Sequence, residues 1–156
     1  MTGANMANPN TGVDLTPYQD KRVIQDVLAT ARTVAIVGLS PNVLRPSNFV
    51  GFYLQRHGYR IVPVNPREKE ILGETSYPAL SAIPFPVDVV DVFRRASQAG
   101  GHVDEAVRAG AKAVWLQLGV IDEAAADRAA AAGLDVVMDR CPAIEWSAHG
   151  PRSAAS

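Results

Sequence analysis

The sequence predicts an α/β fold, a doubly wound sheet of five mainly parallel strands with helices on both faces. Short apolar runs rich in Val and Ile recur at roughly 20- to 25-residue intervals, and segments with apolar residues at helical spacing separate them. Because right-handed crossovers join parallel strands, this alternation places helices on both faces of one sheet. The length of 156 residues suits a single domain of this kind.

The elements follow in order along the chain. A first helix is expected to begin at Pro17, with Thr16 as its N-cap, and to run to about Arg32. Strands are expected at 33–38, 59–64, 87–93, 113–118 and 134–138. Later helices are expected to end at Gly58, Gly110 and Gly133, with short helices over 77–83 and from Pro142.

The two ends of the chain differ in composition from the rest. Residues 1–15 are polar and rich in Asn, Gly and Thr, and we expect a disordered N-terminal segment there. The domain is expected over 16–150, and 151–156 are expected to form a flexible tail. The polar start lacks the basic and then apolar order of a signal peptide.

Charge and cysteine content exclude several classes of protein. A net charge of -1 and a pI near 6.3 argue against a nucleic-acid-binding or anionic-membrane protein. No apolar run approaches the roughly 18 residues of a membrane span. The single cysteine, Cys141, cannot form an internal disulfide, which fits a cytoplasmic location. The three His residues and Cys141 are widely scattered, so we assign no catalytic or metal-ligating residue.

The loops after the strands are the places to look for a ligand, because open parallel sheets bind ligands at the carboxyl ends of their strands. Five arginines are expected in or beside these loops and would attract an anion there: Arg45, Arg67, Arg94, Arg95 and Arg140. After the first strand, Gly38 leaves room for close backbone approach, and Ser40 and Ser47 offer hydroxyls. The next helix should begin near Ser47 and direct its free N–H groups toward a bound phosphate.

The end of the second strand discriminates between nucleotide ligands. NAD-binding domains usually carry an acidic residue there, which holds the ribose 2′-hydroxyl. This chain has Asn65, Pro66 and Arg67 instead, and Arg67 would attract a phosphate on the ribose. The sequence therefore disfavours NAD and leaves NADP and coenzyme A (CoA), both of which carry a ribose phosphate.

Six blocks of the chain resemble the stand-alone bacterial CoA-binding domain family, which is similar to the CoA-binding module of the succinyl-CoA synthetase α subunit. The blocks are 34–40, 45–47, 64–66, 88–94, 110–119 and 139–142. They occur in the same order as in the family, and the resemblance covers about residues 20 to 150. It implies a Rossmann-like sheet with CoA lying across its carboxyl edge.

The resemblance implies the phosphate contacts of CoA residue by residue. Gly38, Leu39 and Ser40 would meet the diphosphate. Arg45 and Ser47 would support the phosphates from the start of the helix.

The other contacts implied by the resemblance lie on later strands. Asn65 and Pro66 would flank the adenosine, and Phe93 and Arg94 would close over it. The pantetheine path and its far end would be lined by Gln117, Gly119 and Cys141.

Cys141 and two aspartates have alternative interpretations. Cys141 is expected at a helix start beside Arg140, where a thiolate would be favoured and could exchange disulfides with CoA. The alternative is a small buried core residue. Asp88 and Asp91 lie on opposite faces of one strand and are expected to act as helix-cap or loop partners.

The function expected from these observations is binding of CoA or an acyl-CoA without catalysis, as a sensor, carrier or regulatory module. In the synthetases a further domain carries a phosphorylated His, and this chain offers no counterpart to it. Two enzymatic alternatives remain, an NADP-dependent oxidoreductase and a CoA-binding subunit of an acyl-CoA ligase. A pure interaction module is a third, and the sequence identifies no protein partner.

Overall fold

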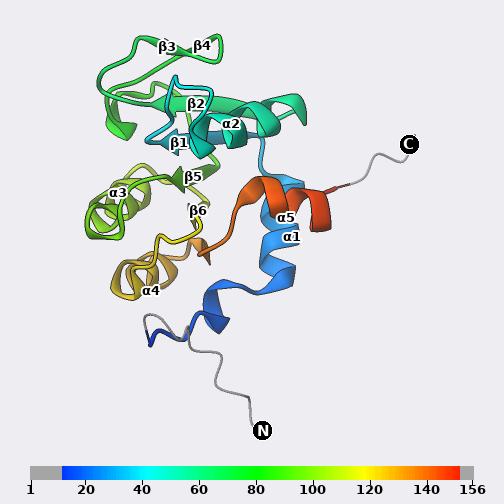
Figure 1. Ribbon diagram of the computed structural model, residues 1–156. Coiled ribbons are helices and arrows are strands. Elements are labelled where there is room, and N and C mark those ends of the chain that lie inside the picture. The colour runs from blue at the N-terminus through cyan, green and yellow to red at the C-terminus, as the bar shows by residue number, and fades with distance from the viewer. Residues whose placement is uncertain (1–11, 152–156) are drawn as a thin grey trace, which may run out of the picture.

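A computed structural model describes residues 12–151 and contains the predicted sheet (Figure 1). Its five parallel strands are β1 (Thr33–Val37), β2 (Arg60–Val64), β5 (Val89–Val92), β6 (Ala113–Leu116) and β7 (Asp135–Met138). They are ordered β2-β1-β5-β6-β7, so the predicted fold class is confirmed. The predictions for 1–11 and 152–156 lie outside the described residues.

In the described part of the chain, five α-helices cover the two faces of the sheet. They are α1 (Lys21–Thr30), α2 (Pro46–Arg56), α3 (Ala96–Arg108), α4 (Glu123–Ala131) and α5 (Pro142–His149). In Figure 1, α3 and α4 lie on one side of the sheet, and α1 and α5 lie on the other. Within residues 12–151, no helix combines the length and the apolar character needed to cross a membrane.

Alternation along the strands divides the core into two layers. Val90 and Val92 of β5 pack with Val103 and other small apolar residues of α3 and α4. Val89, on the opposite face of the same strand, packs with the layer that contains α1, α2 and α5. Both faces of the central strands are thus buried, which explains their nearly continuous apolar sequence.

The start of the first helix differs from the prediction. Thr16–Tyr18 form a separate 3-10 turn, η1, and α1 begins only at Lys21. The N-cap of α1 is Asp20, whose carboxylate accepts hydrogen bonds from the N–H groups of Arg22 and Val23. The sequence thus contains two possible N-caps four residues apart, Thr16 and Asp20. Asp20 caps the longer helix, because its carboxylate also complements the helix dipole.

The predicted boundary at residue 15 is also corrected. Leu15 is buried, and Val13 packs against the same core layer as Leu15. The Tyr18 hydroxyl donates to the carboxylate of Asp127 on α4. These contacts attach the chain before α1 to the α3–α4 face of the sheet.

The segment between β2 and β5 is more regular than its sequence indicates. It contains a small antiparallel hairpin of β3 (Glu70–Ile71) and β4 (Glu74–Thr75), which the sequence analysis missed. The helix expected over 77–83 is only a 3-10 turn, η2 (Leu80–Ala82). Because Tyr77 forms a parallel bridge to Val64, the residues that follow Tyr77 lie beside the carboxyl end of β2.

Candidate functional site

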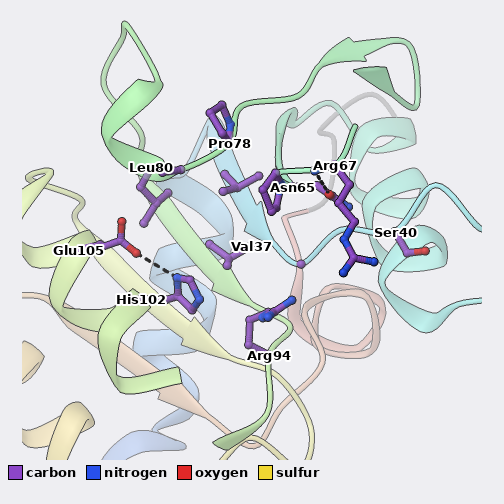
Figure 2. Close-up of a pocket in the computed structure, with 13 residues that line it drawn as sticks. Val37, Ser40, Asn65, Arg67, Pro78, Leu80, Arg94, His102 and Glu105 are labelled. Atoms are coloured by element: carbon purple, nitrogen blue, oxygen red, sulfur yellow. Dashed lines mark hydrogen bonds and ion pairs between the residues drawn. The ribbon is translucent and has the colours of Figure 1, made fainter. Parts of the chain in front are cut away.

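A cavity lies at the carboxyl ends of β1, β2 and β5. The chain passes from β1 outward to β2 and then back across β1 to β5, so the connections of β1 and β5 diverge and leave a crevice at this switch point. The cavity has a volume of about 410 Å³. Its lining, drawn in Figure 2, is Val37, Gly38, Ser40, Val64, Asn65, Pro66, Arg67, Pro78, Ala79, Leu80, Arg94, His102 and Glu105.

Gly38 lets the end of β1 lie against the end of β5. Its φ is +88°, a left-handed conformation that side chains rarely adopt. A Cβ at this position would lie less than 3.0 Å from the carbonyl oxygen of Phe93, which is backbone and cannot swing aside. Glycine is therefore required here both by the turn and by a neighbouring strand.

Replacing Gly38 with alanine is expected to destabilise the protein by about 2 kcal/mol more than Gly58→Ala does. Gly58 also has a positive φ, but nothing lies within 4 Å of a Cβ built on it, so its replacement carries only the backbone strain. Gly38→Ala adds a clash in a packed region, which typically costs about 1–3 kcal/mol. Urea unfolding of both variants measures the difference, and equal losses would contradict the clash.

Ser40 is held in place by the start of α2. Its N–H donates to Ser47 Oγ at 3.0 Å, and its carbonyl accepts from Asn48 Nδ2 at 2.9 Å. Its own Oγ accepts from the N–H of Asn42 at 3.1 Å. Because a hydroxyl can accept and donate together, the Ser40 O–H remains available to donate to an anion in the cavity.

Asn65 fixes the second loop of the site to the first. Its Nδ2 donates to the Leu39 carbonyl at 3.0 Å, and its Oδ1 accepts from the N–H of Arg67 at 2.8 Å. The amide thus bridges the β1 and β2 loops and turns the chain so that Arg67 reaches the cavity. Leu39 itself is fully buried, so any contact it makes with a ligand would come from its backbone.

The five arginines expected at this edge have different environments. Arg67 and Arg94 line the cavity, and Figure 2 shows their side chains extending toward the same space. Arg94 and Arg95 also border an adjoining open groove with Phe93.

The other two expected arginines lie away from the cavity. Arg45 is exposed at the N-cap of α2, outside the cavity lining. Arg140 donates to the side chain of Gln19 and to the Asp139 carbonyl, so its role here is structural.

Three of the expected contact residues lie farther along the edge, outside the cavity lining. Gln117 is buried after β6, and its Oε1 has no hydrogen-bond partner among residues 12–151. Gly119 forms a turn with φ +80° and donates its N–H to Asp139 Oδ1. Cys141 is buried at the N-cap of α5 and belongs to the core layer of α1, α2 and α5.

Sequence reasoning missed one wall of the cavity. Pro78 and Ala79 reach it from the segment before η2, and Leu80 reaches it as the first residue of η2. His102 and Glu105 reach it from α3. The apolar periodicity of α3 was visible in the sequence. Which polar residues of that helix face the ligand edge depends on how the helix packs, and no local signal marks it.

Asp91 in β5 and Asp88, which directly precedes that strand, have very different environments. Asp88 accepts from the N–H groups of Arg32 and Thr33, which confirms the expected loop role. Partial burial alone would raise its pKa, but these N–H groups and Lys112 outweigh burial and lower the pKa below its ordinary value. Asp91 does not have the expected role of a helix cap or loop partner, because it is fully buried and neither carboxyl oxygen has a hydrogen-bond partner within residues 12–151. Burial raises its pKa well above the ordinary value.

Comparison with known proteins shows what this chain is similar to. A family model described as a CoA binding domain matches residues 32–147. The uncharacterized protein YneT of Bacillus subtilis (strain 168) is 37% identical over 121 residues, which are 78% of this chain and 90% of YneT. The structure of a hypothetical protein from Pyrococcus horikoshii OT3 is similar with a TM-score of 0.81 and 35% identity, over 85% of this chain and 94% of that chain.

A more distant structure shares the fold alone. It is the dinucleotide-forming acetyl-coenzyme A synthetase 1 of Ca. Korarchaeum cryptofilum, with 22% identity and a TM-score of 0.64. The match covers 74% of this chain and 28% of the synthetase. The same Rossmann-like arrangement thus occurs both as a short chain and within a much longer one.

Proposed function

The chain belongs to the family of CoA binding domains, and we propose that it binds CoA or an acyl-CoA in the cavity at the carboxyl edge of its sheet. In this proposal the protein acts as a sensor, carrier or regulatory module and performs no catalysis of its own. The cytoplasmic location expected from its single cysteine is part of the same proposal.

The observation that carries the proposal is the pairing of two arginines with a preorganised loop. Arg67 and Arg94 reach the cavity from the ends of β2 and β5, and the β1 loop between them is fixed by its bonds to Ser47 and Asn48. CoA carries a diphosphate and a ribose phosphate, which need several cationic or N–H contacts at once. A ligand with fewer phosphates would leave one of these groups unused.

The end of β2 separates CoA from NAD. Where an NAD-binding domain has an acidic residue to hold the ribose 2′-hydroxyl, this chain has Asn65. Its amide is already hydrogen-bonded to Leu39 in the β1 loop and to Arg67 in its own loop. Arg67 serves a phosphorylated ribose equally well in CoA and in NADP. NADP is therefore the ligand against which the proposal must be tested.

Native mass spectrometry of the purified chain with CoA, acetyl-CoA, NADP and NAD at equal concentration tests the proposal. We expect one equivalent of CoA or acetyl-CoA to bind, with little NADP and no NAD. A parallel thermal shift series should show stabilisation by the same ligands, because ligands that bind only the folded state raise its apparent stability. Preferred binding of NADP would favour the oxidoreductase alternative, and no ligand binding would favour an interaction module.

A further inference from the structure

Two ionisable side chains of α3 form a pair in the wall of the cavity. His102 Nδ1 lies 3.0 Å from Glu105 Oε1, and their side chains are 29% and 27% exposed. In Figure 2 the pair lies on the same side of the cavity as Leu80, and Ser40 and Arg67 lie on the other side. The pair is thus set apart from Ser40 and Arg67, and Arg94 lies between the two sides in this view.

The pair presents one ring nitrogen to a ligand. When the Glu105 carboxylate accepts the Nδ1–H of a neutral imidazole, the Nε2 atom carries a lone pair and is a hydrogen-bond acceptor. Within residues 12–151, Nε2 makes no hydrogen bond, and His102 lines the cavity. An acceptor in this position calls for a donor on the ligand.

Apolar residues that suit a flat ring also line the cavity. They are Val37, Val64, Pro78 and Leu80, and Figure 2 shows Leu80 on the same side as His102. Adenine is the flat, largely apolar part of CoA, and its 6-amino group is a hydrogen-bond donor. In 6-oxopurines such as hypoxanthine and guanine, position 6 carries an oxygen, which is an acceptor. An acceptor at Nε2 would therefore pair with the 6-amino group of adenine and repel the oxygen of a 6-oxopurine.

We infer that His102, held by Glu105, selects the base of the ligand, favouring a 6-aminopurine over a 6-oxopurine. The inference rests on the proposed function, because it assigns the end of the cavity in which the purine of CoA lies. His102 would contact the base itself. Glu105 is a positioning residue, which fixes the ring and keeps the proton on Nδ1.

The test is isothermal titration calorimetry of the wild-type chain with CoA and with its deaminated analogue, in which hypoxanthine replaces adenine. We expect the analogue to bind about 10-fold more weakly, the equivalent of one lost hydrogen bond that leaves a polar group unpaired. Equal affinities would overturn the inference and leave the proposed function intact. Failure of the wild-type chain to bind CoA at all would overturn the proposed function instead.

Variants of the pair show whether the discrimination comes from it. His102→Phe keeps a flat ring but has no acceptor, so the ratio of the two affinities should fall to about 1. Glu105→Leu should reduce the ratio in the same way, and Glu105→Gln should retain much of it because an amide oxygen also accepts from Nδ1–H. A ratio that stays at the wild-type value in both His102→Phe and Glu105→Leu would assign discrimination to other groups and overturn the inference.

Fragments of CoA locate the pair relative to the ligand. Adenosine 3′,5′-bisphosphate contains the base without pantetheine, and 4′-phosphopantetheine contains pantetheine without the base. His102→Phe should weaken binding of adenosine 3′,5′-bisphosphate about as much as it weakens binding of CoA, and it should leave binding of 4′-phosphopantetheine unchanged. If His102→Phe weakens binding of 4′-phosphopantetheine alone, pantetheine lies at His102 and the inference is contradicted. Circular dichroism of each variant checks that it is folded.

Discussion

CoA affinity is expected to fall roughly 100-fold when Arg67 and Arg94 are both replaced by alanine, and roughly 10-fold for each single replacement. Both guanidinium groups face the cavity, and they reach it from the ends of two different strands. Charge-assisted hydrogen bonds contribute about 1.5–3 kcal/mol each, and the lower value applies here because both side chains are solvent-exposed before binding. Calorimetry at fixed ionic strength measures the effect, which should diminish as salt is added.

Neighbouring arginines provide matched controls for this prediction. Arg95 adjoins Arg94 but lies outside the main cavity lining, so Arg95→Ala should bind CoA almost as the wild type does. Arg45→Ala tests the phosphate contact that the family resemblance implies from the start of α2. An Arg67–Arg94 double variant that binds CoA with unchanged affinity would show that the ligand lies elsewhere.

A shortened ligand separates the roles of the two arginines. Dephospho-CoA lacks the phosphate on the ribose and keeps the diphosphate. If Arg67 at the end of β2 contacts the ribose phosphate, Arg67→Ala should weaken CoA but leave dephospho-CoA nearly unchanged. Arg94→Ala, at the end of β5, should weaken both ligands.

The sheet and part of the site could be predicted because their signals are local. Each strand is a short, mostly apolar run, and the first two are closed at once by Gly38 and by Asn65. Parallel strands bring their carboxyl ends to one edge. For that reason Gly38, Ser40, Asn65 and Arg94 were expected together, and all four line one cavity.

The parts that could not be predicted depend on packing between distant segments. The hairpin of β3 and β4 is too short to show an alternating pattern, yet the segment that follows it carries Pro78 and Leu80 to the cavity. Cys141 follows the last strand as expected, and its burial among core residues agrees with the second of the two interpretations that its sequence allowed. The sequence indicates the edge at which a residue lies, and the tilt and packing of each element decide whether it faces the ligand or the core.

Asp91 illustrates the same limit and leads to the second large effect, an expected rise in stability when it is replaced by valine. Its side chain is fully buried in the central part of the sheet, and neither oxygen has a hydrogen-bond partner within residues 12–151. A cavity of only about 10 Å³ adjoins it, beside Tyr59 and Trp115. Burying an unpaired polar group costs about 1–3 kcal/mol, so Asp91→Val should raise the free energy of unfolding at pH 7 by about that amount.

The pH dependence of stability provides the sign test for Asp91. Burial raises its pKa well above the ordinary value of 3.8, so over the intervening pH range the folded state holds a proton that the unfolded state has lost. Its contribution to stability is fully present below pH 3.8 and is lost as the pH rises through the folded-state pKa. The advantage of Asp91→Val over the wild type should therefore grow from pH 4 to pH 7 in urea unfolding.

Two further variants isolate the cause of this effect. Asp91→Asn has nearly the same size and cannot ionise, so it should remove the pH-dependent part and keep the cost of an unpaired polar group. Asp88→Asn should show the opposite pH dependence: the variant should be less stable than the wild type at pH 7, and this difference should shrink as the pH falls. The lowered pKa of Asp88 stabilises the folded state above pH 3.8, and that stability is lost as the pH falls through the folded-state pKa. A valine variant less stable than the wild type at pH 7 would mean that the Asp91 carboxyl is satisfied in solution, by a water molecule held in the adjoining cavity.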